Sequence, residues 1–105
     1  MEFIINGQHW EIKEMDTKTL NDSFKGEEDE FLYGFCSYKE NVIYLNETLT
    51  EDRKKHTLMH ELTHCWTFEN GWGFTAKISR ENLCNIVASI NTFINDITNE
   101  YFERR

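Results

Sequence analysis

The chain has 105 residues, 39% hydrophobic and 14% aromatic, which is enough for one domain with its own core. Its 19 acidic residues outnumber the 11 basic ones and give a formal net charge of −8. So negative a chain is a poor ligand for nucleic acid or an anionic membrane surface, and we expect neither partner. The three cysteines, Cys36, Cys65 and Cys84, are widely spaced without a C-x-x-C pair, which argues against a zinc ribbon and a disulfide framework.

The amino terminus has no basic region followed by a long apolar run, and so does not resemble a signal peptide. No stretch approaches the ~18–20 apolar residues that a membrane-spanning helix needs. With the cysteine pattern, this predicts a cytoplasmic protein with a single domain over residues 1–105.

Two β-hairpins are predicted in the first half of the chain. Asn6-Gly7 separates the apolar runs 3–5 and 9–12, and both turn residues accept positive φ. The runs 31–38 and 41–45 are rich in aromatic and β-branched residues, with a polar turn at 39–41. Between the hairpins, residues 13–21 fit either a short helix or a loop, and the charge run 25–30 fits a solvated loop.

The two hairpins predict a small antiparallel sheet of three or four strands. The strand that contains Ile43 and Tyr44 leads directly into the next predicted helix. If it lies at the edge of the sheet, it can pair with an extended peptide through main-chain hydrogen bonds. We therefore expect Ile43 and Tyr44 to contribute to substrate binding, the alternative being an ordinary structural strand.

Two long helices are predicted in the second half. The first runs from Glu51 to Asn70, with Thr50 as N-cap and Gly71 as stop signal, and the second runs over 80–103 with Ser79 as N-cap. Apolar residues recur at helical spacing and define the core faces. They are Leu58, Met59, Leu62, Cys65 and Trp66 on the first helix and Leu83, Ile86, Val87, Ile90, Ile94 and Ile97 on the second. The predicted fold class is α+β, with the sheet packed against both helices.

The opposite side of the second helix carries small and polar residues: Glu81, Cys84, Asn85, Ala88 and Thr92. If that stripe faces the first helix, Glu81 comes close to it, and the large apolar stripe is then covered by the sheet. Cys65 and Cys84 are expected to be buried packing residues. The aromatic connector 70–75 is expected to cap the core.

The stretch His60-Glu61-Leu62-Thr63-His64 reads H-E-x-x-H within the first helix. Positions four apart share a helix face, so the two histidines can bind one ion from consecutive turns. The carboxylate between them can take a proton from a metal-bound water. The motif therefore predicts a Zn²⁺ site with His60 and His64 as ligands and Glu61 as general base.

Catalytic zinc commonly has three protein ligands, so one remains to be found. Glu81 opens the second helix 17 residues after His64, which leaves room for a turn and an antiparallel return. His56 competes as a nitrogen ligand, but three ligands on consecutive turns of one straight helix do not easily surround a tetrahedral ion. Glu81 is the preferred third ligand. Tyr38, Tyr44 and His56 are candidates for the second donor that stabilises the oxyanion.

These segments resemble gluzincin-type metallopeptidases of the ImmA/IrrE class, which phages and mobile elements often carry. In that class a Glu opens the helix after H-E-x-x-H, and a small residue and Asn or Asp follow three and four positions later. Glu81, Cys84 and Asn85 match that pattern, as does Ala88. The stretch 34–45 also resembles small phage-borne members, and the resemblance extends over about 33–88. The chain lacks the further helical segment of longer members and a helix-turn-helix region. Minimal one-domain gluzincins are a second resemblance.

The resemblance implies a zinc-dependent endopeptidase with a protein or peptide substrate. Some members of the class relieve repression by cutting a repressor, so a repressor-like substrate is implied by resemblance alone. Three alternatives stay open: a zinc-binding interaction protein of the anti-repressor type without hydrolysis, a metal-free domain, and a zinc hydrolase of small amides.

Overall fold

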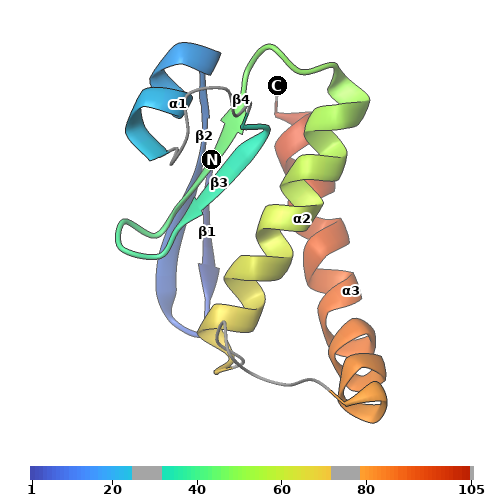
Figure 1. Ribbon diagram of the computed structural model, residues 1–105. Helices are drawn as coiled ribbons and strands as arrows, with labels where there is room; N and C mark the ends of the chain where they lie inside the picture. Colours follow the sequence, from blue (N-terminus) through green and yellow to red (C-terminus); the bar gives the residue numbers. More distant parts are fainter. Residues whose placement is uncertain (25–31, 72–78, 105) are drawn as a thin grey trace.

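The structure is a computed structural model, and it describes residues 1–24, 32–71 and 79–104. The predicted loop at 25–30 and residues 72–75 of the predicted core-capping connector lie outside these ranges. In chain order the elements are β1 (Glu2–Ile5), β2 (Gln8–Met15), α1 (Thr17–Phe24), β3 (Gly34–Ser37), β4 (Val42–Asn46), α2 (Glu51–Glu69) and α3 (Arg80–Glu103). Figure 1 shows the sheet with α1 on one side and with α2 and α3 on the other. The α+β prediction is confirmed.

Both predicted hairpins form. In the first, Asn6 and Gly7 have φ values of 49° and 80°, as a two-residue hairpin turn requires, and β1 pairs antiparallel with β2. In the second, β3 pairs antiparallel with β4, and Asn41 in the turn has a φ of 58°. The chain lacks proline, and these turns are formed by residues in the left-handed conformation.

The prediction that the sheet is antiparallel throughout is wrong. The strand order is β1-β2-β4-β3, and the central pair β2 and β4 is parallel, with Ile12 opposite Ile43. Helix α1 supplies the crossover that a parallel pair needs. It is held under the sheet by Leu20, which is fully buried against Val42 and Tyr44.

The prediction that Ile43 and Tyr44 lie on an edge strand is also wrong. They belong to β4, which is hydrogen-bonded to β2 on one side and to β3 on the other. Ile43 is fully buried and Tyr44 is 5% exposed. The edge strand beside α2 is β3.

The predicted ends of both long helices are confirmed to within one residue. The Thr50 hydroxyl accepts a hydrogen bond from the Arg53 N–H at 3.3 Å, which caps α2. The Ser79 hydroxyl accepts one from the Asn82 N–H at 3.1 Å, which caps α3. Gly71 follows α2 with a φ of 81°. No helix in the described ranges is long and apolar enough to cross a membrane.

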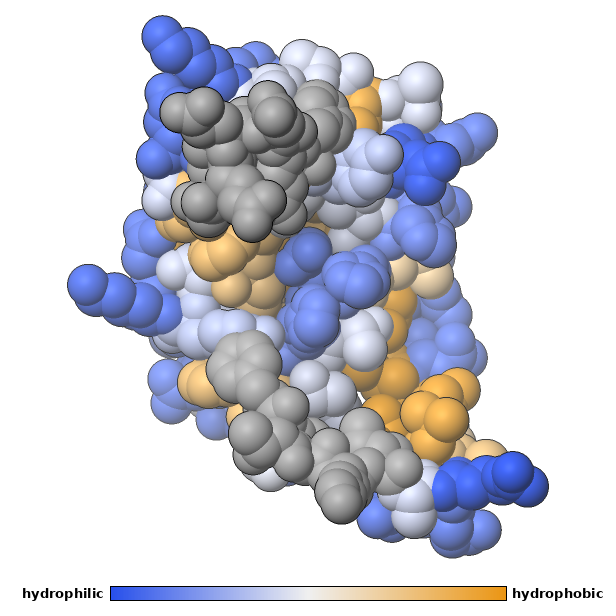
Figure 2. Space-filling model, viewed as in Figure 1, coloured by the Kyte–Doolittle hydropathy of each residue, from blue (hydrophilic) through white to orange (hydrophobic). Residues whose placement is uncertain are grey.

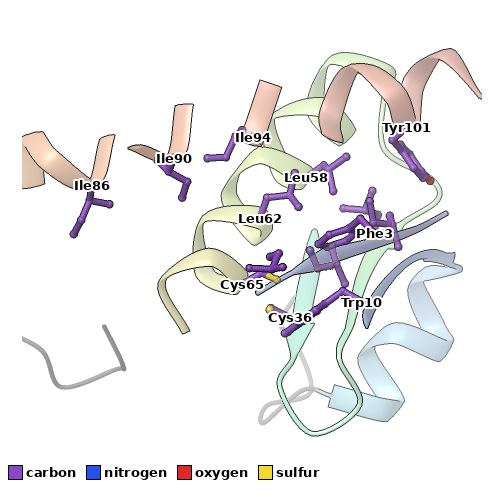
Figure 3. Packing of buried hydrophobic residues seen from close by; sticks show 14 residues of the cluster. Phe3, Trp10, Cys36, Leu58, Leu62, Cys65, Ile86, Ile90, Ile94 and Tyr101 are labelled. Atoms are coloured by element: carbon purple, nitrogen blue, oxygen red, sulfur yellow. The ribbon is translucent and has the colours of Figure 1, made fainter. Parts of the chain in front are cut away.

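The main core lies between the sheet and the two long helices. Leu58, Leu62 and Cys65 of α2 are fully buried in the same cluster as Phe3 and Trp10 of the sheet. Figure 3 shows Ile94 of α3 close to Leu58 and Leu62, while Ile86 and Ile90 lie nearer to the start of α3. Full burial of one such aliphatic side chain contributes about 2 kcal/mol, so this cluster fixes α2 firmly on the sheet.

Helix α3 turns only part of its predicted apolar stripe inward, and the prediction is wrong for Leu83 and Val87, which are exposed. Ile86, Ile90 and Ile94 are buried, whereas the small polar stripe is exposed: Glu81, Cys84, Asn85, Ala88 and Thr92. The suggestion that this stripe faces α2 is therefore wrong, as is the prediction that Cys84 is buried. Burial of branched apolar side chains gains more free energy than burial of small polar ones, which decides the orientation of the helix.

A buried ion pair also connects α2 to the sheet. The Lys54 side chain is 8% exposed, and its Nζ lies 2.8 Å from Oε1 of Glu14 on β2. The Tyr101 hydroxyl of α3 donates a hydrogen bond to the other oxygen of Glu14. Strand β2, helix α2 and helix α3 thus meet at the Glu14 carboxylate. Lys54, which contacts this carboxylate from α2, lies in the first half of the helix that carries H-E-x-x-H.

Candidate functional site

The two histidines of the motif lie side by side on the exposed surface of α2. Their Nε2 atoms are 3.1 Å apart, and the ring planes are 77° to each other. Two nitrogens bound to one tetrahedral zinc at ~2.0–2.1 Å would be about 3.3 Å apart, so the pair fits one ion. Burial, and then the charge of His60, lower the pKa of His64. That shift favours the neutral imidazole, which is the form that binds metal.

Glu61 occupies a different side of α2 from the histidines. Its side chain is only 8% exposed, and together with Thr57 it faces β3. Burial raises the pKa of the Glu61 carboxyl to about 7. The helical wheel groups Glu61 and Thr57 with the histidines, but the edge strand covers both of them, so the carboxylate lies in a partly dry position next to an exposed pair of nitrogens.

Gly34 allows β3 to pass this close to α2. A Cβ atom at this position would lie 2.8 Å from Thr57 Cγ2 and 2.9 Å from the Tyr44 carbonyl oxygen. It would also lie 3.4 Å from Glu61 Cγ. Any larger residue would push the edge strand away from the carboxylate. Gly34 is a site residue that sequence reasoning missed; its isolated position inside a predicted strand was the available signal.

Two adjoining hollows follow the line between β3 and α2. One, of about 540 Å³, is lined by residues 34–39 with Glu61 and His64. The other, of about 370 Å³, is lined by residues 32–34 with Arg53, His56, Thr57, His60 and Glu61. They meet at Gly34 and Glu61, so an extended chain lying along β3 would cross the carboxylate. In Figure 2 a polar band crosses the middle of α2, and an apolar patch lies over the start of α3.

The three candidate oxyanion donors fall in different places. Tyr44 points to the opposite face of the sheet, where its hydroxyl donates to Glu40 Oε2 at 3.0 Å and its ring packs on Phe24. Its position excludes it as a donor at this site. Tyr38 lines the larger hollow, with its ring 4.5 Å from that of Phe68, and burial raises its pKa. His56 lines the smaller one.

Glu81 lies in the first turn of α3 with its side chain exposed. Figure 1 shows that the first turns of α3 diverge from α2. Within residues 1–24, 32–71 and 79–104, no three His, Cys, Asp or Glu side chains form a group that could hold a metal ion. The described structure therefore brings the two histidines together and places Glu61 in a hollow with each of them, while Glu81 belongs to the diverging first turn of α3.

A family model described as the IrrE N-terminal-like domain (Peptidase_M78) matches residues 12–104. The chain belongs to this family. The match extends from β2 through α3 and includes the histidine pair, Glu61 and the edge strand. The expected relation to the ImmA/IrrE class is confirmed at the level of the family, and the family suggests a peptidase or an IrrE-type regulatory protein. No curated protein and no solved structure matches this IrrE-like chain.

Proposed function

We propose that the chain is a zinc-dependent metallopeptidase. One observation carries the proposal: a pair of exposed imidazole nitrogens 3.1 Å apart adjoins a buried carboxylate at the meeting point of two hollows. The family match supports peptidase chemistry. The two nitrogens, His60 Nε2 and His64 Nε2, supply two neutral donors of the type that zinc prefers.

Glu81 is proposed as the third zinc ligand on the basis of the sequence pattern. Its exposed position at the start of α3 leaves it accessible, and its binding would require those turns to approach α2. When bound, zinc would polarise the scissile carbonyl and acidify a water molecule. His60 and His64 would hold the ion as neutral rings.

Glu61 is proposed as the general base. Burial raises the pKa of the Glu61 carboxyl to about 7. The carboxyl would therefore hold a proton taken from the attacking water more readily than an exposed glutamate. The same carboxyl would then pass the proton to the leaving amine. The substrate is proposed to be a protein or peptide that lies extended along β3, at the edge of the sheet. Its main-chain groups would form hydrogen bonds with those of β3. A repressor-like substrate remains a proposal that rests on the resemblance.

The test compares the parent chain with Glu61→Gln. We expect one zinc per chain in both by native mass spectrometry, because Glu61 is not a ligand in this scheme. We expect cleavage of a mixed protein digest to fall by roughly 10²–10⁴-fold in the variant, since it removes the general base. Glu69→Gln, on the same helix outside both hollows, is the matched control and should cleave like the parent. Undiminished cleavage by Glu61→Gln would refute the assignment.

A zinc-binding or metal-free interaction protein is the alternative. The observation that favours it is the absence, among the described residues, of a group of three potential ligands. An anti-repressor that acts by contact would keep its effect on its partner in Glu61→Gln. A peptidase would lose that effect together with cleavage, so the same variant separates the two functions.

A further inference from the structure

The smaller hollow beside the histidine pair has a charge opposite to that of the whole chain. The chain carries a formal charge of −8. The hollow is lined by Arg53, His56 and His60, and Glu61 is the one carboxylate among the described residues that line it. Because Glu61 is buried at the floor, the exposed rim presents nitrogen donors. Such a local reversal of charge selects an anionic group.

Arg53 is held at this rim by the fold. It lies in the first turn of α2, where its main-chain N–H donates to the Thr50 cap. Its guanidinium lies over the ring of Tyr33, 5.7 Å from the ring centroid. Tyr33 directly precedes β3, so the contact connects the start of the edge strand to the start of the helix. A stacked guanidinium keeps its N–H donors available to a carboxylate.

No acidic side chain of the described residues forms an ion pair with Arg53. The ion pairs of the described residues are Lys54–Glu14 and Arg104–Glu100, and neither of them includes Arg53. Asp52 is next to Arg53 in sequence and shares a further hollow with it at the start of α2, but no ion pair joins these two described side chains. The guanidinium is therefore positioned by an aromatic ring, and no carboxylate among the described residues pairs with it.

The larger hollow differs in character. It is walled by residues 34–39, including the aromatic side chain of Tyr38 and the thiol of Cys36, whereas the ring of Phe35 stacks on Phe24 on the other face of the sheet. Its cation, Lys39, lies in the turn after β3 at the far end. An extended peptide that crosses Glu61 would place side chains in both hollows, one mainly apolar and one cationic.

Resting on the proposed peptidase function, we propose that Arg53 determines specificity by binding an aspartate or glutamate side chain of the substrate, on the side of the scissile bond that faces the start of α2. The substrate class is an extended peptide with an acidic residue on one side of the cleavage point and an apolar residue on the other. A charge-assisted hydrogen bond in a half-enclosed hollow is expected to favour acidic over neutral side chains about tenfold.

The experiment is affinity capture from a random octapeptide library by the full chain carrying Glu61→Gln, with zinc added and the bound peptides sequenced by mass spectrometry. We expect acidic residues to be enriched at one position. Adding Arg53→Glu should abolish that enrichment or convert it to lysine and arginine. Lys55→Glu makes the same charge change two residues along the same helix, at an exposed position outside the hollows, and should leave the enrichment intact.

The proposal is overturned if captured peptides show no acidic preference or if none is captured. It is also overturned if the preference survives Arg53→Glu, is lost equally in Lys55→Glu, or depends on Lys39 instead in a Lys39→Glu variant. Failure of the peptidase function has a different signature. In that case the zinc-loaded parent leaves the captured acidic peptides uncut, while the dependence of capture on Arg53 persists.

Discussion

Helix α2 and the first turns of α3 carry residues proposed to bind the same ion, yet the fold holds them very differently. Leu58, Leu62 and Cys65 anchor α2 with no exposed area. In contrast, the start of α3 exposes Glu81, and Leu83 and Val87 are 51% and 55% exposed. The difference teaches that the core positions two nitrogens and a carboxylate in the metal-free protein, whereas the proposed third ligand, Glu81, would have to move towards them.

The largest effect that tests this comparison is expected from the buried lysine of α2. Lys54→Ala leaves Glu14 without its cation and should lower the free energy of unfolding by about 3 kcal/mol. Lys54→Met keeps the packing of the aliphatic stem and should cost less. Urea denaturation measures both changes. Lys55→Ala, at an exposed neighbour, should stay within about 0.5 kcal/mol. Equal losses at both lysines would mean that the ion pair does not anchor the helix.

A pH-dependent effect is expected at Glu61 in the metal-free protein. Its pKa is about 7 in the folded chain against 4.5 in the reference state, so the folded state binds the extra proton between these values. Stability should therefore fall as pH rises through that window and level off above it. Glu61→Gln removes this loss, and should be more stable than the parent by about 3 kcal/mol above pH 7 and nearly equal to it near pH 4.5.

The measurement is urea denaturation after chelator treatment at about pH 5.5, in the lower part of the expected titration range, and at about pH 8.5, above that range. Glu69→Gln is the control and should show no such pH-dependent gain. A Glu61→Gln gain that is the same at both pH values would mean that burial does not hold the carboxyl protonated.

A smaller loss is expected where the edge strand passes closest to α2. Gly34→Ala places a Cβ 2.8 Å from Thr57 Cγ2 and 2.9 Å from a backbone oxygen. The strand must shift, which should cost about 1–3 kcal/mol in thermal or urea unfolding. Ala at Gly7 meets nothing within 4 Å but is strained by a φ of 80°, so it separates close packing from backbone strain. Wild-type stability of Gly34→Ala would contradict the close packing of β3 on the helix.

The smallest stability effect is expected at the start of α3. Glu81→Ala should change the free energy of unfolding of the metal-free chain by no more than about 0.5 kcal/mol, because the side chain is exposed. The same change should weaken zinc binding in a competition assay with a chromogenic chelator. In the parent, zinc should also slow amide hydrogen exchange in the first turns of α3. Glu103→Ala, at the exposed end of α3, is the control. Unchanged zinc affinity in Glu81→Ala would remove Glu81 from the ligand set.

Local signals accounted for the elements and for the reactive face of α2. Asn6-Gly7 predicted the first turn, Thr50 and Ser79 predicted the helix starts, and the four-residue spacing of His60 and His64 predicted their contact. Each depends on interactions within a few residues, so the sequence contains the information directly. The assignment of zinc and of Glu81 stays a prediction.

Tertiary structure alone decided the order of the strands and the surroundings of Glu61. The crossover through α1 places β4 inside the sheet and makes β3 the edge, because Leu20 finds its buried position under Tyr44. Close packing at Gly34 then encloses Glu61, and the ring of Tyr33 contacts Arg53 at the smaller hollow. These contacts join residues that are distant in sequence, and their geometry follows from how the apolar faces pack together. The periodicity of a single segment cannot specify that packing.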